Sequence, residues 1–276
     1  MPEPAIDARA ARRRFERAAA SYARASRLET EIGARMLERL DYVKLAPRRV
    51  LDAGSGPGRD ARLLARRYRA AGIVALDFAP AMLRAGKRRL FERNPPRAVC
   101  GDIARLPIAS GSVDLVWSNM ALHWAADAPA ALREFHRVLA VGGLLMLSTL
   151  GPDTLGALRA AAGEGRVHRF VDMHDLGDAL VAVGFAAPVM DMERLTLLYA
   201  GADALLEDLR ASGQTGAAPG RARGLAGRRF LARLRDALDA QRRDGALPIG
   251  FEVVYGHAWK PEPKRAADGR AIVQFY

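Results

Sequence analysis

The sequence has little cysteine, no long apolar run and no metal-like spacing of histidines. Its single cysteine, Cys100, excludes a disulfide within the chain and is typical of a reducing compartment, so we expect a cytoplasmic protein. No apolar run approaches the roughly 18 residues that a membrane-spanning helix needs, so we expect a soluble chain with no membrane partner. His136, His174 and His257 lack the ligand spacing of a metal site, so we expect no metal.

Lysine is scarce, although the chain is strongly basic. The net charge is +12, and only four of the 43 basic residues are lysines. A surplus of positive charge predicts an acidic partner, which can be a nucleic acid, an anionic membrane or an acidic protein. A compositional bias of the genome toward arginine explains the same surplus equally well. Charge alone therefore leaves the partner open.

Apolar segments of two kinds alternate from residue 48 to about residue 150. Short β-rich runs are typical of buried strands, and segments with helical spacing lie between them. This alternation indicates a parallel sheet with helices on both faces, so we predict an α/β fold. The predicted strands are 48–54, 72–78, 97–103, 112–119, 142–151, 187–199 and 248–259, and the predicted helices are 59–70, 80–93 and 127–139. The long last strand is expected to form a hairpin with its neighbour at the sheet edge.

The chain is expected to form one main domain with helical additions. With 276 residues and 50% hydrophobic content, it can bury one large core. Helical spacing of apolar residues near both ends of the chain indicates segments outside the sheet, which together would form a lid. We therefore predict an N-terminal helical lid segment at 1–45, a core at 46–200, a helical insertion at 201–246, the last core strand at 247–260 and a flexible tail at 261–276.

A glycine-rich turn follows the first predicted strand, in the sequence VLDAGSGPG. Gly54, Gly56 and Gly58 let the backbone turn tightly and approach a ligand, and the helix that follows offers free N–H groups. The spacing is G-x-G-x-G, whereas dinucleotide sites have G-x-G-x-x-G, which suits a pyrophosphate. The Asp52 carboxylate before the turn would repel a phosphate but would attract a cationic, amine-bearing ligand. The turn therefore favours a cationic ligand over NAD(P).

Three more strand ends carry residues suited to a ligand. Asp77 ends the second strand, where a carboxylate can accept both hydroxyls of a ribose. Asp102 and Ile103 end the third strand and suit an adenine, because the carboxylate can accept the exocyclic amine while the apolar side chain packs on the ring. Asn119 ends the fourth strand, at the edge where ligands bind in such folds. Each residue alone is also explained as a helix cap or turn residue, but all of them in register predict one site.

This series of motifs resembles the S-adenosylmethionine-dependent methyltransferases of the seven-stranded class I fold. The resemblance implies a Rossmann-like, mostly parallel sheet of about seven strands with an antiparallel last strand. It also implies S-adenosyl-L-methionine as the cofactor and S-adenosyl-L-homocysteine as the product. The implied cofactor-binding residues are Asp52, Gly54 and Gly56 at the amino-acid end, Asp77 at the ribose, Asp102 and Ile103 at the adenine, and Asn119 at the neighbouring strand end.

Five longer segments resemble one family within that class, the malonyl-acyl-carrier-protein O-methyltransferases of biotin synthesis. They are RFERAAASYARASRLE (14–29), WSNMALHWAADAPAALREFHRVL (117–139), STLGPDTLGALRAA (148–161), HRFVDMHDLGDAL (168–180) and LPIGFEVVYGHAWKP (247–261). The family implies methyl esterification of the free carboxylate of a malonyl thioester, which lets fatty-acid synthesis extend a dicarboxylate precursor. A carboxylate is ionised at about pH 7, so it needs no general base. It needs a cation, best a planar guanidinium in a site shielded from water.

The same resemblance implies four candidate catalytic residues. Arg169 stands at the arginine of the family's N-R-F motif and would grip the carboxylate, whereas a surface arginine paired with Asp172 is the alternative. Tyr22 would close over the cofactor or the substrate, unless it is only an apolar contact on a helix. Trp124 would form a wall of the acceptor pocket. His123 beside it is expected to hydrogen-bond rather than to transfer a proton.

The acidic carrier protein that the family implies would give the positive charge a use. Six arginines lie in or after the glycine-rich loop of the predicted lid, at Arg221, Arg223, Arg228, Arg229, Arg233 and Arg235. Phe230, Leu231, Leu234 and Leu238 form an apolar stripe among them, so we expect a helix that packs on one face and is basic on another. Such a helix would suit docking of the carrier. A run of charge is also common on a face that is merely solvated.

Two other functions remain open on the sequence. The mitochondrial complex I assembly factor, a protein-arginine hydroxylase or non-methylating cofactor binder, shares GDTL-type, DLG and tyrosine-rich last-strand motifs. It lacks the N-R-F arginine and the full SNxALxW block. A small-molecule or tRNA methyltransferase is the other alternative, suggested for nucleic acid by the charge alone. The sequence has no NPPY-like motif, no catalytic cysteine pair and no added RNA-binding module, so a nucleic-acid partner is not expected.

Overall fold

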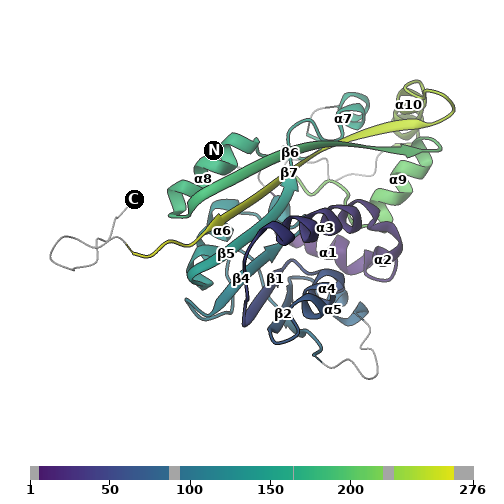
Figure 1. The fold of residues 1–276 in the computed structure, drawn as a ribbon. Coiled ribbons are helices and arrows are strands. Elements are labelled where there is room, and N and C mark those ends of the chain that lie inside the picture. Colours follow the sequence, from purple (N-terminus) through teal and green to yellow (C-terminus); the bar gives the residue numbers. More distant parts are fainter. Residues whose placement is uncertain (1–5, 87–93, 164, 220–226, 264–276) are drawn as a thin grey trace.

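The computed structural model describes residues 6–86, 94–163, 165–219 and 227–263. Within them, seven strands form one sheet in the order β3-β2-β1-β4-β5-β7-β6 (Figure 1). The strands are β1 Arg49–Ala53, β2 Gly72–Asp77, β3 Arg97–Cys100, β4 Val113–Ser118, β5 Leu139–Leu150, β6 Ala186–Tyr199 and β7 Leu247–Trp259. Only β7 is antiparallel to its neighbours β5 and β6, while the other pairs are parallel. The predicted sheet with its antiparallel last strand is confirmed.

Helices cover both faces of this sheet. The helices are α1 Ala8–Ala18, α2 Tyr22–Ala25, α3 Arg27–Arg39, α4 Arg59–Arg67, α5 Pro80–Ala85, α6 Ala128–Val138, α7 Gly156–Ala162, α8 Met173–Val183, α9 Ala202–Ala211 and α10 Arg228–Asp239, with short 3-10 turns η1 Leu40–Tyr42 and η2 Leu122–Trp124. Ile32 of α3 and Leu64 of α4 are buried on one face, in a large cluster that forms the main core. Phe135 of α6 and Leu180 of α8 are buried on the other face. The two-layer cover explains why β5 is apolar along nearly its whole length.

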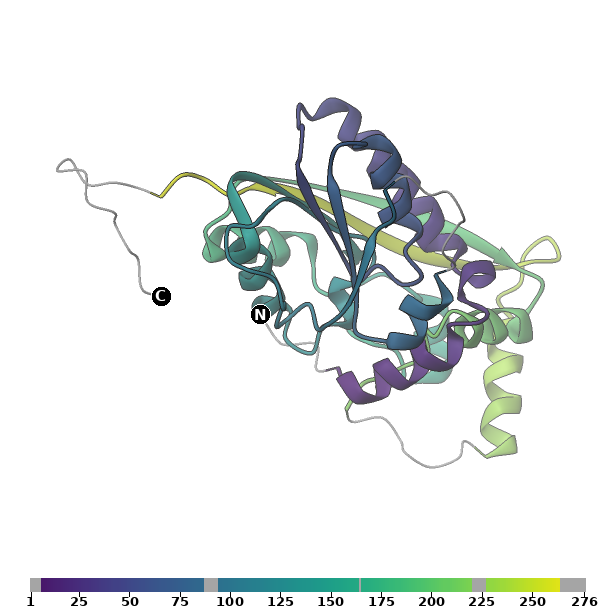
Figure 2. The ribbon, with the colours of Figure 1, turned by 90° about the horizontal axis from the view of Figure 1, so that it is seen from below.

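The two predicted lid segments meet in space, although the core sequence separates them. Helix α1 contacts both α5 and α9, while α10 contacts α7 and α9. In Figure 2, α1 and α9 are seen to lie on the same side of the sheet. Ile32 of α3, Leu205 of α9 and Leu234 of α10 all belong to the main core, whereas Phe15 of α1 belongs to a separate cluster. The division of the chain into a core and a lid stays a prediction.

The predicted helices are longer than the observed ones, and backbone dihedrals show why. Helix α4 ends at Arg67, because Tyr68 leaves the helical region with φ −109° and ψ 71°. Helix α5 ends at Ala85 before an extended Gly86, and the predicted remainder at 87–93 lies outside the described residues. Part of the predicted tail, 264–276, also lies outside them. None of the helices in the described ranges is long and apolar enough to cross a membrane.

Candidate active site

The glycine-rich turn joins the end of β1 to the start of α4 near the centre of the sheet. Gly54, Gly56 and Gly58 have φ values of +85°, +53° and +75°, which residues with side chains rarely adopt. A Cβ atom at Gly54 would also lie 2.2 Å from the Ala121 Cβ, so this position needs glycine for two reasons. The Gly56 amide donates a 2.9 Å hydrogen bond to the Asp77 carboxylate. The turn is thereby tied to the end of β2.

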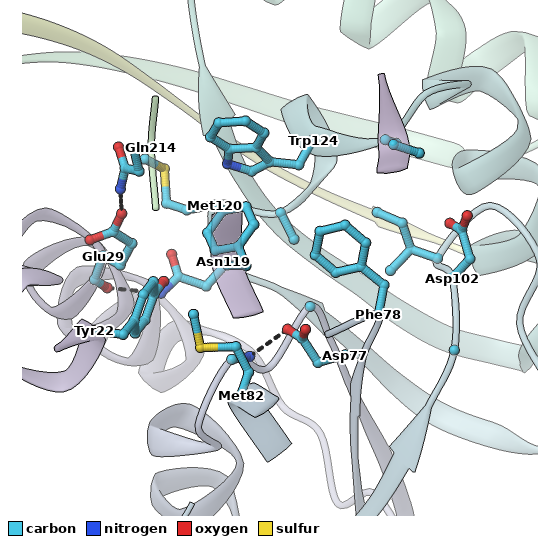
Figure 3. Close-up of a pocket in the computed structure, with 18 of the residues that line it drawn as sticks. Tyr22, Glu29, Asp77, Phe78, Met82, Asp102, Asn119, Met120, Trp124 and Gln214 are labelled. Atoms are coloured by element: carbon cyan, nitrogen blue, oxygen red, sulfur yellow. Dashed lines mark hydrogen bonds between the residues drawn. The ribbon is translucent and has the colours of Figure 1, made fainter. Parts of the chain in front are cut away.

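A cavity at the carboxyl ends of the strands, which we call the strand-end cavity, gathers most of the predicted site (Figure 3). Its volume is about 60 Å³. The predicted residues that line it are Tyr22, Gly54, Gly56, Asp77, Asp102, Ile103, Asn119 and Trp124. Asp52 lines an adjoining open cavity of about 1100 Å³, which we call the acidic cavity. The structure therefore brings the predicted cofactor residues together, and their roles stay predictions.

Carboxyl groups are concentrated in this region. Asp52, Asp60 and Asp77 are buried, and Glu29 lines the same two cavities. Burial, reinforced by the charge of Asp60, raises the pKa of Asp52. Burial also raises the pKa of Asp77 to about 6 and that of Glu29 to about 7. The Oδ2 atom of Asp52 is buried with no hydrogen-bond partner among the described residues, so this carboxylate lacks a donor or a cation.

The acidic cluster is not arranged as a metal site. Among the described residues, no three His, Cys, Asp or Glu side chains are grouped so that they could hold a metal ion. An organic cation fits the same negative potential, because it needs hydrogen-bond acceptors and an apolar surround rather than a coordination shell. The predicted absence of a metal stays a prediction.

Hydrogen bonds hold Asn119 in place at the end of β4. Its amide donates to the Asp60 carboxylate at 2.8 Å and to the Glu29 carbonyl oxygen at 2.9 Å. The Ser148 hydroxyl donates to the Asn119 Oδ1 atom at 2.9 Å, and the Trp117 indole donates to Asp60 at 3.3 Å. Asp60 and Glu29 were missed as site residues from the sequence. Asp60 looks like an acidic residue in the first turn of a helix, and Glu29 lies in a segment predicted as a lid.

Asp77 and Asp102 also make the turn contacts that were their alternative explanation. The Asp77 carboxylate accepts the Ala79 amide at 2.8 Å as well as the Gly56 amide. The Asp102 carboxylate accepts the Ala104 amide at 2.9 Å. The two explanations do not exclude each other, because an ionised carboxylate has about four acceptor sites. The backbone bonds orient each carboxylate and leave acceptor sites for a ligand.

Aromatic rings surround the strand-end cavity. The ring of Phe15, on α1, lies 5.0 Å from that of Trp124 and 5.7 Å from that of Phe78, both edge-on. Figure 3 shows Tyr22, Phe78 and Trp124 around the same space. Burial and then the charge of Glu29 raise the pKa of Tyr22, so its phenol stays protonated at neutral pH. Aromatic faces of this kind attract a cation and exclude water.

A further cavity lies between the core and the lid helices, and we call it the lid cavity. It measures about 210 Å³ and shares Trp124 and Gln214 with the strand-end cavity. Its apolar lining is Leu150, Leu155, Leu158, Ala162, Val167, Phe170, Leu206, Leu209, Phe230 and Leu234. The predicted residue His123 lines this cavity, with Nδ1 at 3.3 Å from the Thr149 hydroxyl. Burial lowers the pKa of His123 to about 3, so the ring is neutral.

Arg169 lies outside the linings of these three cavities. It stands between α7 and α8, its side chain is exposed, and no hydrogen bond or ion pair joins it to another described residue. Its alternative partner Asp172 instead caps α8, where the carboxylate accepts the His174 amide at 2.8 Å. The flanking residues His168 and Phe170 do line the lid cavity. The substrate contact of Arg169 therefore stays a prediction.

The sheet order, the glycine turn after β1 and the cavity at the strand ends define a class I methyltransferase fold. A family model described as "Methyltransferase domain" matches residues 51–147. A solved structure of a putative methyltransferase from Bacillus halodurans has a TM-score of 0.61 to this chain at 18% identity, covering 83% of this chain and 98% of that one.

Relatives of known name narrow the class. A malonyl-acyl-carrier-protein O-methyltransferase from Laribacter hongkongensis is 52% identical over 278 residues, which covers 95% of this chain and 93% of the relative. The enzyme of the same name from Gallionella capsiferriformans is 49% identical over 284 residues, with 99% and 98% covered. The chain belongs to the malonyl-acyl-carrier-protein O-methyltransferase family.

Proposed function

We propose that this protein transfers the methyl group of S-adenosyl-L-methionine to the free carboxylate of a malonyl thioester on acyl carrier protein. The products are the malonyl methyl ester and S-adenosyl-L-homocysteine, and the ester would enter fatty-acid synthesis for the pimeloyl stage of biotin synthesis. The observation that carries the proposal is the contact between an acid-lined strand-end cavity and a separate lid cavity, in a chain 52% identical to a relative of that name. The single cysteine supports a cytoplasmic location.

The cofactor fits the residues at the strand ends. When bound, it supplies a methyl group on a cationic sulfur. An oxygen nucleophile can attack the methyl carbon, and the sulfur is then the leaving group. The unpartnered Asp52 oxygen and the neighbouring carboxylates suit its cationic amino-acid end, and the tight turn at Gly54 and Gly56 lets the backbone approach it. Asp77 has acceptor sites for ribose hydroxyls, and Asp102 with Ile103 suits the adenine. Asn119 keeps the acidic cluster in position.

The acceptor side needs alignment rather than a base. A malonyl carboxylate is already ionised at about pH 7, so the protein has to orient it and exclude water. The protonated Tyr22 and the neutral His123 can donate or accept hydrogen bonds, and neither is suited to remove a proton from the acceptor. Trp124 separates the two cavities and would guide the carboxylate toward the methyl group. The exposed side chain of Arg169 would have to change its conformation to reach the acceptor.

Docking of the acidic carrier on α10 is a further part of the proposal. Phe230, Leu234 and Leu238 of α10 pack inward, and Phe230 and Leu234 also line the lid cavity. Arg228, Arg229 and Arg233 are exposed on the same helix, and Arg235 forms a 2.7 Å ion pair with Asp203. One helix would thus present both a cavity wall and a basic surface. The predicted docking residues Arg221 and Arg223 lie outside the described residues.

The test is methyl transfer by the purified protein. We expect incubation with S-adenosyl-L-methionine to convert malonyl carrier protein to its methyl ester, detected by mass spectrometry of the intact carrier. Unloaded and acetyl-loaded carrier serve as controls, since neither has the free carboxylate. A folded, cofactor-binding sample that leaves malonyl carrier protein unchanged but modifies tRNA or a protein arginine would overturn the proposal in favour of one of the alternatives.

A further inference from the structure

Two guanidinium groups line the otherwise largely apolar lid cavity. Arg166 precedes α8 in the chain, and Arg210 lies in the last turn of α9; both residues are exposed, so they stand where the cavity opens. The Arg166 guanidinium carbon lies 3.9 Å from the centroid of the Phe230 ring. No side-chain hydrogen bond or ion pair joins Arg166 or Arg210 to another residue in the described ranges. Two cations at the mouth of an apolar cavity, without a carboxylate partner, suit an anion from outside the chain.

Backbone contacts place Arg166 near the junction of the two cavities. A Cβ atom at Gly216 would lie 2.6 Å from the Arg166 carbonyl oxygen, and the Ala217 amide donates to the His168 ring. The segments 166–168 and 214–217 therefore lie side by side. Gln214 is two residues from Gly216, a span of at most about 7 Å, and it lines both cavities. The Arg166 side chain is long enough to cover the span from Gly216 to Gln214, where the two cavities meet.

Gln214 fixes the junction to the cofactor side. Its amide donates to the Glu29 carboxylate, as Figure 3 shows, so the loop after α9 is tied to the start of α3. Arg210 lies four residues before Gln214, which is about one helical turn. At the end of α9 the chain makes a turn, in which the Gly213 amide donates to the Arg210 carbonyl oxygen at 3.1 Å. Both arginines therefore belong to segments that end at the shared boundary.

We infer that Arg166 and Arg210 bind the carboxylate of the malonyl thioester in the lid cavity. This inference deepens the proposed function and rests on it. A guanidinium offers two parallel N–H donors to a carboxylate, and stacking on Phe230 holds the Arg166 plane in one orientation before the acceptor arrives. Methylation removes the negative charge, so the pair binds the substrate more tightly than the methyl ester and favours product release.

The pair also makes the site specific for a dicarboxylate acceptor. An acetyl or butyryl thioester in the cavity would displace water from both guanidinium groups without offering an anion in return, which carries a free-energy cost. The two arginines thus discriminate against uncharged acyl groups that the apolar walls alone would accept.

The experiment compares three acceptors with each arginine changed. Malonyl carrier protein and malonyl coenzyme A carry both a carboxylate and a phosphate, whereas malonyl-N-acetylcysteamine carries only the carboxylate. We expect Arg166→Ala and Arg210→Ala each to raise KM about tenfold or more for all three acceptors. We expect the affinity for S-adenosyl-L-methionine, measured by calorimetry, to change by less than about twofold, because neither residue lines the strand-end cavity. Arg166→Lys should recover part of the loss, since it keeps the charge but not the fork.

Controls separate the outcomes. Arg133→Ala, on the exposed side of α6, removes one arginine that lines none of the three cavities and should leave every KM unchanged. A loss with the two phosphate-bearing acceptors alone would assign the pair to the phosphate and overturn the inference. Unchanged KM values in both alanine variants, with a loss in Arg169→Ala, would assign the carboxylate to Arg169 instead. Wild-type protein that binds the cofactor but methylates none of the three acceptors would overturn the proposed function itself.

Discussion

The strand-end cavity and the lid cavity differ in how the chain builds them. The strand-end cavity is lined by consecutive strand ends of one sheet, at Gly54, Asp77, Asp102 and Asn119, and its charged groups are mainly carboxylates. The lid cavity is assembled from segments between residues 123 and 234, and its charged groups are Arg166 and Arg210. Opposite charges therefore face each other across Trp124 and Gln214.

This difference separates two kinds of recognition. Buried carboxylates favour a cationic donor, and guanidinium groups favour an anionic acceptor, so each reactant has one preferred side. Transfer of the methyl group neutralises both the cationic sulfur and the carboxylate at once. The protein then holds two uncharged reaction centres in cavities built for charge, which weakens the binding of both products. Substitutions on each side can therefore show whether the two cavities act separately.

The largest effect is expected from Gly54→Ala in the strand-end cavity. The new Cβ would lie 2.2 Å from the Ala121 Cβ. The alanine would also have to adopt the φ value of +85°, which residues with side chains rarely adopt. We expect the affinity for S-adenosyl-L-methionine to fall by about a hundredfold or more, since strain costs about 1–2 kcal/mol before the clash is counted. Calorimetric titration with the cofactor, with thermal unfolding measured in parallel, gives the result.

Gly142→Ala is the matched control for that substitution. Gly142 has φ +74°, but a Cβ atom added there would meet no other atom within 4 Å, so it shares the strain without the clash. We expect a small loss of thermal stability and unchanged cofactor binding. Equal cofactor affinity in both variants would mean that the turn tolerates the clash and that Gly54 does not shape the cavity.

Most of the strand-end cavity could be predicted because its chemistry is local in sequence. The turn at Gly54 and Gly56 follows a strand directly, and Asp77 ends the next strand, so alternation of strands and helices places them together. Glu29 and Asp60 escaped prediction although they belong to the same cluster. Their positions depend on packing of α3 and α4 against the sheet, and a helix pattern gives no sign of which polar residue turns toward the strand ends.

The lid cavity could be predicted only in part. Trp124 and His123 follow a strand end and were found, whereas Gln214 and Arg166 were missed. The contact between Gln214 and Glu29 joins residues 185 positions apart, and no local pattern encodes such a pairing. Arg169 was singled out by resemblance, yet the neighbouring Arg166 lines the cavity, because the direction of a side chain in an irregular segment has no period to follow.

An intermediate effect is expected from charge reversal on α10, which tests whether the lid also recognises the carrier. The double variant Arg228→Glu with Arg229→Glu should raise KM for malonyl carrier protein about tenfold and reduce its dependence on salt. Turnover of malonyl-N-acetylcysteamine should not change, because this acceptor has no carrier. The new acidic residues lie in the first turn of α10, where they favour the helix, so the fold should persist.

A control reverses the charge of two arginines at the start of β1, away from α10. Arg48 and Arg49 are exposed beside the start of β1, and their backbone amides, not their side chains, bind Asp114. Arg48→Glu with Arg49→Glu changes the net charge by the same amount. An equal rise in KM from this pair would show a general charge effect and would remove α10 as a docking surface.

A change of pH is expected to have a smaller effect. This effect tests the carboxylates of the strand-end cavity and not the arginines of the lid cavity. The pKa of Asp77 rises from its ordinary 3.8 to about 6, and that of Glu29 from 4.5 to about 7, both chiefly through burial. The ligand-free folded protein then binds more protons than the unfolded chain, so its free energy of unfolding falls as pH rises from about 4 to about 7. The cationic cofactor favours the ionised carboxylates, so the rise in Tm that it causes should grow over this window.

Thermal scans at several pH values, with and without S-adenosyl-L-methionine, measure this dependence. Glu29→Gln removes the group with the higher pKa and should flatten the upper part of the curve, while the lower part set by Asp77 remains. A cofactor-induced rise in Tm that is constant between about pH 5 and 8 would show that these carboxylates do not respond to the cofactor's charge.

The smallest effect is expected from helix caps, which compare the lid with the core directly. The Asp7 carboxylate accepts the Ala10 amide at 2.9 Å and begins α1, whose Phe15 lines the strand-end cavity. The Asp127 carboxylate accepts the Ala130 amide at 2.7 Å and begins α6, which is buried in the core. Replacing either by alanine removes about 1 kcal/mol of capping energy.

The predicted division into lid and core implies that the two substitutions act on different measurements. Asp127→Ala should lower Tm, since α6 unfolds with the core, and should leave the cofactor affinity unchanged. Asp7→Ala should weaken cofactor binding by up to about fivefold, because a frayed α1 no longer holds Phe15 over the cavity, with a smaller change in Tm. Equal losses of Tm in the two variants would mean that α1 unfolds together with the sheet, and the distinction between lid and core would then fail.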